Sequence, residues 1–211
     1  MLSSIRDVGR ASETAGSVGV PPPEMLKSLS GIEYLQRIVD GRLPRPPITE
    51  TLGFAITEVA PGFALFTMTP QFRHYNPIGT VHGGVAATLL DSCMSCAVQT
   101  HLQPGTGYTT LEIKVNMVRP ITDKTGPIRA EGRSLHVGRR SATAEGRIFD
   151  MAGTLLAHAT TTCIIFAAGS HSTVFPMCCE ITRRLQSDPS LRSSRVLAAC
   201  VCPFGMRLSG G

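Results

Sequence analysis

A histidine, two glycines and an acid surround the start of an apolar helix in the stretch HYNPIGTVHGGVAATLLD, residues 74–91. Gly83 and Gly84 have no side chains where the helix begins. Their backbone N–H groups and the positive end of the helix dipole are therefore open to a developing oxyanion. Asp91 follows seven residues after Gly84. Donors of this kind together with a carboxylate are suited to chemistry on a carbonyl group.

The helix that must position these groups is expected over residues 85–102, where VAATLLDSCMSCAVQTHL places apolar residues on every side. This pattern is typical of a helix wrapped by a sheet or by a partner. Asp91 needs a partner or a wet cavity there, because burying an unpaired carboxylate costs several kcal/mol. A purely structural acid, bonded to a neighbouring hydroxyl, is the alternative interpretation.

Extended segments flank this helix on both sides. Residues 54–59 and 63–69 alternate around Pro61-Gly62 and predict a β-hairpin. Four further segments predict a meander, at residues 108–118, 128–137, 141–150 and 154–166. The order predicts an α+β architecture, with one long helix packed in the curve of a six-stranded antiparallel sheet.

The remaining segments are predicted to flank a main domain over residues 51–168. Residues 1–23, rich in Gly, Ser and Pro, predict a disordered leader. Apolar residues at helical spacing predict one helix over 24–41, and a Pro-rich linker follows it to residue 50. Residues 169–211 are rich in Ser, Arg and Cys without a sustained period, and predict a low-order tail.

Composition excludes several functional classes. Residues 51–168 carry nine basic and seven acidic side chains, without the basic stripe that a nucleic-acid partner needs. Asp91 interrupts the longest apolar run and the N-terminus has no signal-peptide core, so we expect a cytoplasmic protein without a membrane partner. Cys93 and Cys96 have CxxC spacing, but without a second pair they favour two small buried residues. No metal and no cofactor is expected.

Several motifs in a fixed order resemble the hot-dog fold acyl-CoA thioesterases of the phenylacetyl-CoA thioesterase (PaaI) type, over about residues 30–166. Asn76 lies six residues before His82 of the HGG motif, and Asp91 lies seven residues after Gly84. The strand GYTTLEIKVNMVRP and the turn GRRSATAEG follow. HGG alone is a weak signal, but the ordered set is specific. The resemblance implies a homodimer or homotetramer whose sheets pack edge to edge, with active sites at the subunit interface.

The resemblance also implies roles for individual residues. Asp91 is the implied nucleophile or general base, and the Gly84 N–H is the implied donor to the thioester carbonyl. Asn76 is implied to orient the thioester or a water, and a plain turn asparagine before Pro77 is the alternative interpretation. His82 is implied to shape the glycine turn, and a purely structural role is the alternative.

Two threonines and several cations complete the candidate site. Thr110, or else Thr109, falls where relatives place a hydroxyl that positions the attacking water. Coenzyme A carries phosphates, which call for exposed cations near the mouth of the cleft. The expected substrate contacts are Gly83, Thr109, Arg139 and Arg140, with Arg119 as a second choice.

We therefore expect an acyl-CoA thioesterase that hydrolyses a small or aromatic acyl-CoA to the free acid and coenzyme A. The coenzyme A thiolate leaves readily, so an activated water and an oxyanion donor suffice. A hot-dog enoyl-CoA hydratase or dehydratase is one alternative, although such enzymes usually place an aspartate before the asparagine and histidine, whereas here Asp91 comes last. A non-catalytic acyl-CoA-binding or regulatory module is the other.

Overall fold

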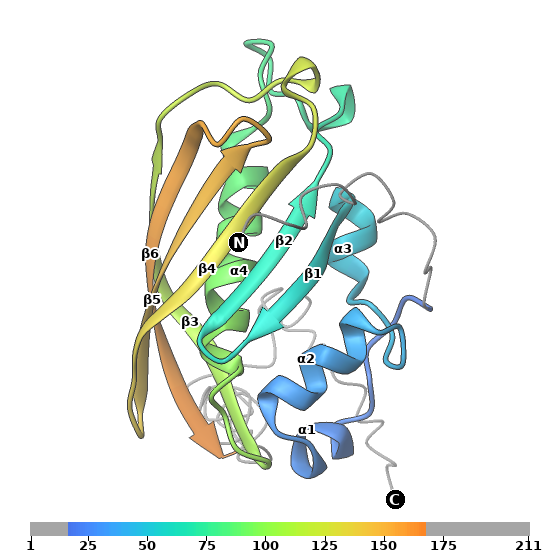
Figure 1. The fold of residues 1–211 in the computed structure, drawn as a ribbon, viewed down its shortest axis with the longest axis vertical. Coiled ribbons are helices and arrows are strands. Elements are labelled where there is room, and N and C mark those ends of the chain that lie inside the picture. The colour runs from blue at the N-terminus through green and yellow to red at the C-terminus, as the bar shows by residue number, and fades with distance from the viewer. Residues whose placement is uncertain (1–16, 168–211) are drawn as a thin grey trace, which may run out of the picture. The chain divides into compact units, whose positions relative to one another are not determined.

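Six strands form one antiparallel sheet in the order β1-β2-β4-β5-β6-β3 in the computed structural model, which describes residues 17–167. The strands are β1 (Phe54–Ala60), β2 (Phe63–Met68), β3 (Thr106–Met117), β4 (Ile128–Val137), β5 (Ser141–Asp150) and β6 (Leu155–Ala167). The long helix α4 (Gly83–Gln99) lies against one face of the sheet, behind β2 and β4 in Figure 1. The predicted architecture of one long helix in a curved six-stranded sheet is confirmed.

The contact between α4 and the sheet forms the core. The fully buried side chains of α4 are Leu89, Leu90, Cys93, Met94, Ala97 and Val98, each 0% exposed. Gly132 of β4 brings the two elements close together, because a Cβ atom there would overlap the carbonyl group of Cys93. Backbone contact of this kind fixes the depth and rotation of α4 against the sheet.

The position of β3 differs from the predicted meander. Strands β4, β5 and β6 pair in succession as expected. Strand β3 pairs with β6 and not with β4, because β2 occupies the other edge of β4. Strand β3 therefore lies at one end of the sheet, and within residues 17–167 no strand pairs with its outer edge. A bulge interrupts its register between Thr110 and Glu112.

The N-terminal flank contains two helices, α1 (Glu24–Ser28) and α2 (Gly31–Val39), where one was predicted over residues 24–41, and a third, α3 (Pro47–Leu52), follows them. The prediction of one continuous helix is wrong because Ser30 starts a new one. Its side chain accepts the Glu33 N–H and the Glu33 carboxylate accepts the Ser30 N–H, a capping box. The Pro-rich linker forms α3 because Pro47 suits the first helical position. None of the described helices combines the length and apolarity needed to cross a membrane.

Only residues 17–23 of the predicted leader are described. The Gly19 N–H donates to the Arg45 carbonyl at 3.0 Å, and the Arg45 N–H donates to the Ser17 carbonyl at 2.9 Å. This short segment is therefore held against the Pro-rich linker, an arrangement that the leader prediction did not include. Residues 1–16 and the predicted tail over 169–211 lie outside the described residues.

Candidate functional site

Helix α4 carries a row of small or polar side chains opposite Cys93 and Met94, which we call the polar stripe. Its members recur every three or four residues and share one side of the helix: Thr88, Asp91, Ser92, Ser95, Cys96 and Gln99. Sequence reasoning treated this helix as apolar on every side. Asp91 and Ser92 are half-buried, whereas Ser95 and Gln99 are buried, so the stripe is more open toward the start of the helix.

Two hydroxyl groups bind the carboxylate of Asp91. Thr110 Oγ1, from β3, donates to Asp91 Oδ1 at 2.8 Å. Ser95 Oγ, one turn further along α4, donates to the same oxygen at 3.3 Å, and the two hydroxyl oxygens are 3.2 Å apart. We call these three residues the Asp91 cluster. Both bonds use Oδ1, and within residues 17–167 no hydrogen bond joins Oδ2 to another group.

The Asp91 cluster distinguishes between the two candidate threonines. Thr110 contacts Asp91, and Thr109 points to the other face of β3 because successive residues of a strand alternate. Sequence reasoning missed Ser95. The signal that identifies it is its position four residues after Asp91, which places both side chains on one side of a helix.

His82 caps the start of α4 with its ring. The Gly84 N–H donates to His82 Nδ1 at 2.9 Å. The predicted oxyanion donor is therefore engaged by an exposed imidazole, which must turn aside before that N–H can bind a ligand. Gly83 is the first residue of α4, so its N–H group comes before the first hydrogen bond within the helix. This N–H group lies next to that of Gly84. A Cβ atom on Gly83 would be 3.4 Å from Met117 Cε.

Asn76 organises the loop that leads into this turn. Its Oδ1 accepts the N–H groups of Ile78 at 3.1 Å and of Thr80 at 3.3 Å, and its Nδ2 donates to Thr80 Oγ1 at 3.1 Å. The Val81 N–H donates to the Ile121 carbonyl at 2.8 Å, which ties the end of the loop to the chain after β3. Within this chain, the observed role of Asn76 is to shape the turn.

The glycine turn and the Asp91 cluster are separate within one chain. Gly84 precedes Asp91 by seven residues, and a helix rises about 1.5 Å per residue, so the two backbone positions are roughly 10 Å apart along the axis. The Gly84 N–H also points toward the start of the helix, away from Asp91. One carbonyl group cannot contact both groups of the same chain.

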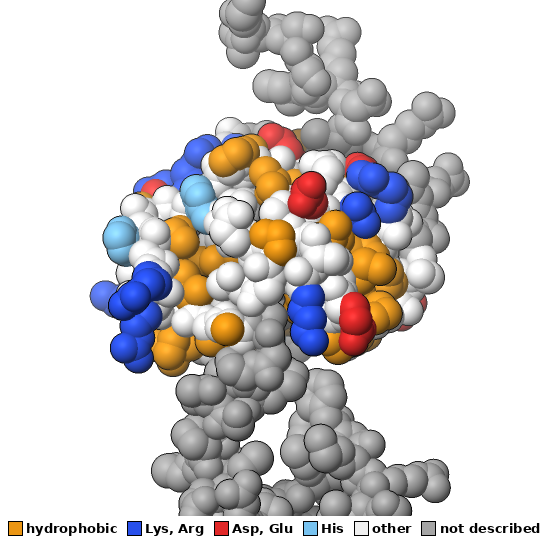
Figure 2. Space-filling view, turned by 90° about the horizontal axis from the view of Figure 1, so that it is seen from below, with side chains coloured by type: hydrophobic (Ala, Val, Ile, Leu, Met, Phe, Trp, Pro, Cys, Tyr) orange, Lys and Arg blue, Asp and Glu red, His pale blue; other side chains and the backbone are white. Residues whose placement is uncertain are grey.

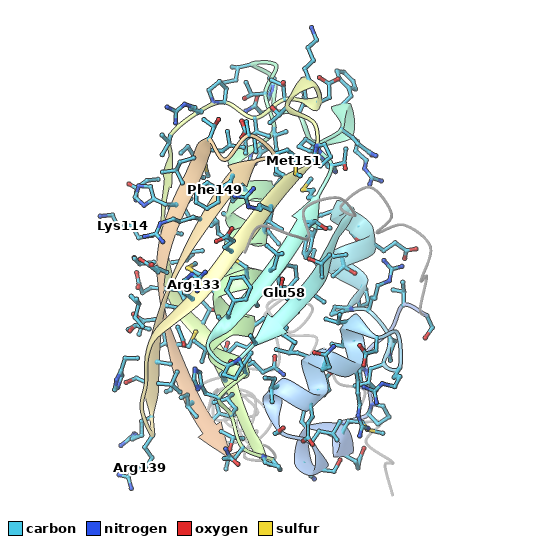
Figure 3. All side chains as sticks on the ribbon, in the orientation of Figure 1. Glu58, Lys114, Arg133, Arg139, Phe149 and Met151 are labelled. Atoms are coloured by element: carbon cyan, nitrogen blue, oxygen red, sulfur yellow. The ribbon has the colours of Figure 1, made fainter. Side chains whose placement is uncertain are left out.

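Arg139 and Arg140 lie at the far end of α4, in the turn between β4 and β5. Arg139 borders an open hollow of about 380 Å³ together with Thr106, His101 and Ile165. Figure 3 shows Arg139 at the lower end of the sheet, and Figure 2, a view of that end, shows Lys and Arg side chains at several separate places on it. The structure therefore brings this arginine to the start of β3 and not to the glycine turn.

Arg119 follows β3 and lies near the end of the sheet that is opposite to Arg139. Its guanidinium donates to the carbonyl of Leu155, the first residue of β6, at 2.7 Å. That bond leaves the rest of an exposed guanidinium close to the loop that holds the glycine turn. Among the arginines predicted to contact the coenzyme, Arg119 is the one on the side of the start of α4.

Neutral side chains surround the Asp91 cluster. Burial raises the pKa of the Cys96 thiol to about 12, and the charge of Asp91 acts in the same direction. Burial likewise raises the pKa of Tyr108 well above its usual value, and it raises that of Cys93. Cys93 and Cys96 are therefore packed thiols, in agreement with the sequence interpretation. Within residues 17–167, no group of three or more His, Cys, Asp or Glu side chains is placed to hold a metal ion.

Comparison with known proteins places this arrangement in a family. Residues 78–157 match the model of the thioesterase superfamily. The proofreading thioesterase EntH of Klebsiella pneumoniae is 30% identical over 102 residues, which are 48% of this chain and 73% of the relative. The 1,4-dihydroxy-2-naphthoyl-CoA hydrolase of Listeria monocytogenes is 27% identical over 52% of this chain and 87% of the relative.

Solved structures show the same fold. The phenylacetic acid degradation-related protein of Ralstonia eutropha superposes with a TM-score of 0.57 at 29% identity, over 62% of this chain and 98% of that one. A single-residue variant of the PaaI protein of Thermus thermophilus superposes with a TM-score of 0.51 at 28% identity, over 56% of this chain and 97% of that one. The predicted resemblance to hot-dog thioesterases is thereby confirmed, and the chain belongs to the thioesterase superfamily.

Proposed function

We propose that this protein is an acyl-CoA thioesterase that hydrolyses a small or aromatic acyl-CoA to the free acid and coenzyme A. The observation that carries the proposal is the Asp91 cluster, in which Thr110 and Ser95 both bind the same carboxylate oxygen, Oδ1. Membership of the thioesterase superfamily supports thioester hydrolysis as the reaction class.

The cluster suits either of two mechanisms. As a general base, Asp91 takes a proton from a water while the resulting hydroxide adds to the carbonyl carbon of the thioester. As a nucleophile, Asp91 adds to that carbon itself and forms an anhydride that water then hydrolyses. In both mechanisms the carbon–sulfur bond breaks, coenzyme A leaves as its thiolate, and the thiolate takes up a proton.

A complete site requires two copies of the chain. Gly84 and Asp91 of one chain are roughly 10 Å apart along α4, too far for one carbonyl group. A second copy can supply the helix start that polarises the carbonyl above Asp91 of the first. We place that second copy at the outer edge of β3, which carries Thr110, because no strand within residues 17–167 pairs with this edge and such an edge readily pairs with another strand.

Strand β3 also provides a path for the coenzyme. The pantetheine arm from the sulfur to the first phosphate is about as long as four extended residues, roughly 14 Å. Four residues separate Thr110 from Thr106, a span of about 13 Å along a strand. A pantetheine arm that runs from Thr110 toward the start of β3 would bring the phosphates to the hollow that Arg139 borders. This match supports Arg139, with Arg140 beside it, as a phosphate contact.

The two alternatives make different demands on the site. A hydratase needs an acid and a base on either side of an acyl double bond, whereas the observed partners of Asp91 are two hydroxyls. A binding module needs no oriented carboxylate, so the Asp91 cluster favours an enzyme over it. Binding without thiol release remains an outcome of the experiment below.

Replacement of Asp91 by asparagine tests the proposal. The amide keeps the size of the side chain and removes the base, so we expect thiol release from acetyl-, benzoyl- and decanoyl-CoA to fall at least about 100-fold. A thiol reagent follows the reaction, and thermal melting checks the fold. The matched control is Glu58→Gln, an exposed acid of β1 that Figure 3 shows on the outer face of the sheet.

The control variant should retain the wild-type rate. Full hydrolysis of every thioester by Asp91→Asn would contradict the proposed role of Asp91. If calorimetry showed that the wild-type protein binds acyl-CoA while no thiol appeared, the binding module would replace the enzyme.

A further inference from the structure

Strand β3 changes the set of side chains that it turns toward the core partway along its length. Tyr108 packs against the core, so even-numbered residues face α4 in the first part of the strand. Ile113 and Val115 pack against the same core, so odd-numbered residues face α4 in the second part. Side chains of a regular strand alternate strictly. The bulge between Thr110 and Glu112 is therefore what separates the two parts.

This bulge determines which side chain of β3 reaches Asp91. Thr110 lies just before the bulge and donates to Asp91 Oδ1 at 2.8 Å. Leu111 is the extra residue, and its side chain is 61% exposed. If β3 paired with β6 without the bulge, the alternation that keeps Ile113 on the core face would turn Leu111 toward α4 and Thr110 away from it. The carboxylate would then face an apolar side chain in place of a hydroxyl.

Thr161 of β6 holds the bulge from the core face of the sheet. Its Oγ1 donates to the Glu112 carbonyl at 2.7 Å. The side chain is 2% exposed, and β-branched side chains have few χ1 rotamers, so packing fixes the direction of this hydroxyl. Within residues 17–167 no strand pairs with the outer edge of β3. Of the strands described, β6 is therefore the one that can hold the bulge in place.

Cys163 connects Thr161 to the Asp91 cluster along the same face of β6. It pairs with Thr110 across the two strands and is 0% exposed. Burial raises the pKa of its thiol, and the hydroxyl groups of Thr110, Thr161 and Ser95 act in the opposite direction. Three hydroxyls of this region therefore lie close to one sulfur atom. A shift of the bulge would disturb this packing and the Asp91 cluster together.

We propose that Thr161 is a positioning residue of this enzyme, which holds the β3 bulge in the register where Thr110 binds Asp91. The inference rests on the proposed thioesterase function. Thr161 acts through other groups: its bond to the Glu112 carbonyl fixes the bulge, and the bulge directs the Thr110 hydroxyl. Loss of the Thr161 hydroxyl therefore disturbs the orientation of the attacking carboxylate and leaves the coenzyme contacts in place.

Replacement of Thr161 by valine tests this inference, because valine keeps the shape of the side chain and removes the hydroxyl. Thiol release is followed with whichever of acetyl-, benzoyl- and decanoyl-CoA the wild-type protein hydrolyses fastest. We expect kcat to fall at least about tenfold with little change in KM, since small displacements of a catalytic group lower the rate steeply. Thr161→Ser keeps the hydroxyl and should retain most of the wild-type kcat.

The matched control is Thr162→Val, on the next residue of β6. The Thr162 hydroxyl donates to the carboxylate of Glu112 at 3.1 Å in an exposed bond, and not to the carbonyl at the bulge. This variant should keep the wild-type kcat. Thermal melting of all variants checks the fold.

The double variant Thr110→Val with Thr161→Val separates positioning from general damage to the protein. Substitutions that act through one shared group have non-additive effects. The double variant should therefore be no slower than Thr110→Val alone. If it is slower by the full factor that Thr161→Val causes by itself, the inference is overturned. Wild-type kcat in Thr161→Val, or equal losses in Thr161→Val and Thr162→Val, overturns it as well.

Failure of the proposed function gives a different result. If the wild-type protein releases no thiol, or if Asp91→Asn keeps full activity, the thioesterase proposal fails and the inference fails with it. The outcomes that overturn only the role of Thr161 leave Asp91 as the catalytic acid. Should Thr161→Val not fold, Thr161→Ala provides the same comparison, because alanine also removes the hydroxyl. An unchanged kcat or full additivity with Thr110→Val in that variant likewise overturns the inference.

Discussion

At the scale of single residues, the carboxylate of Asp91 depends on hydroxyls from two different elements. Thr110 belongs to the edge strand β3, and Ser95 belongs to α4 itself. The short 2.8 Å bond from Thr110 orients Oδ1, while Ser95 contributes a longer bond to the same atom. Loss of the Thr110 hydroxyl therefore frees the carboxylate to rotate without removing its charge.

We expect Thr110→Val to lower kcat by about 10- to 100-fold, since a hydrogen bond to a charged group is worth about 1.5–3 kcal/mol. The KM for acetyl-CoA should change little, because the variant disturbs the attacking group and not the coenzyme contacts. Thiol-release kinetics measure both constants. Thr109→Val is the matched control, a neighbouring threonine on the other face of β3. Equal losses of kcat in the two variants would refute the assignment.

At the scale of elements, the approach of α4 to β4 determines where the polar stripe lies. Gly132 admits the backbone of α4 at Cys93, whereas a Cβ atom on Gly146 of β5 would lie 2.8 Å from Cγ of the flexible Met94 side chain. These two glycines differ in what a methyl group would meet. At Gly132 it meets a backbone carbonyl that cannot move alone, and at Gly146 it meets a side chain that can change its rotamer.

Gly132→Ala should therefore lower the free energy of unfolding by about 3 kcal/mol or more, at the upper end of overpacking effects. Gly146→Ala should cost about 1–2 kcal/mol, because Met94 can adapt. Urea denaturation followed by circular dichroism measures both values. A smaller cost at Gly132 than at Gly146 would show that α4 is not held by backbone contact with β4.

At the scale of the whole molecule, our proposal for how copies of the chain meet rests on the outer edge of β3, which no strand within residues 17–167 pairs with. Exposed apolar side chains lie along or just after this strand: Leu111 is 61% exposed, Met117 50% and Val118 44%. Thr110 of the Asp91 cluster lies on the same strand. Pairing of two chains at this edge would cover apolar surface and bring a second helix start to the site, as the separation of Gly84 and Asp91 requires.

We expect the protein to be at least a dimer in solution and the double variant Leu111→Lys with Val118→Lys to shift it toward the monomer. Charges on an edge strand oppose strand pairing. Light scattering after size-exclusion chromatography gives the mass, and thiol release should fall together with the dimer fraction. The control is Leu135→Lys on β4, a leucine that is 60% exposed. An active monomer would contradict a shared site.

Much of the fold follows from local sequence signals. The hairpin around Pro61-Gly62 and the bounds of β4 and β5 match the prediction, because period-two alternation and turn residues are local properties. The break at Ser30 was equally local, since its capping box with Glu33 is visible in the sequence, yet apolar periodicity concealed it. The place of β3 beside β6 depends instead on which strand edges are already occupied.

The sequence by itself determined the family resemblance, the helix with its glycine start, and Asp91 as the acid within that helix. These features depend on residue type and spacing along the chain. Only the tertiary structure decided that Thr110 and Ser95 bind Asp91, that His82 engages the Gly84 N–H, and that Arg139 lies at the far end of α4. The reason is physical: such contacts depend on strand register, helix rotation and strand order, which packing against distant segments determines.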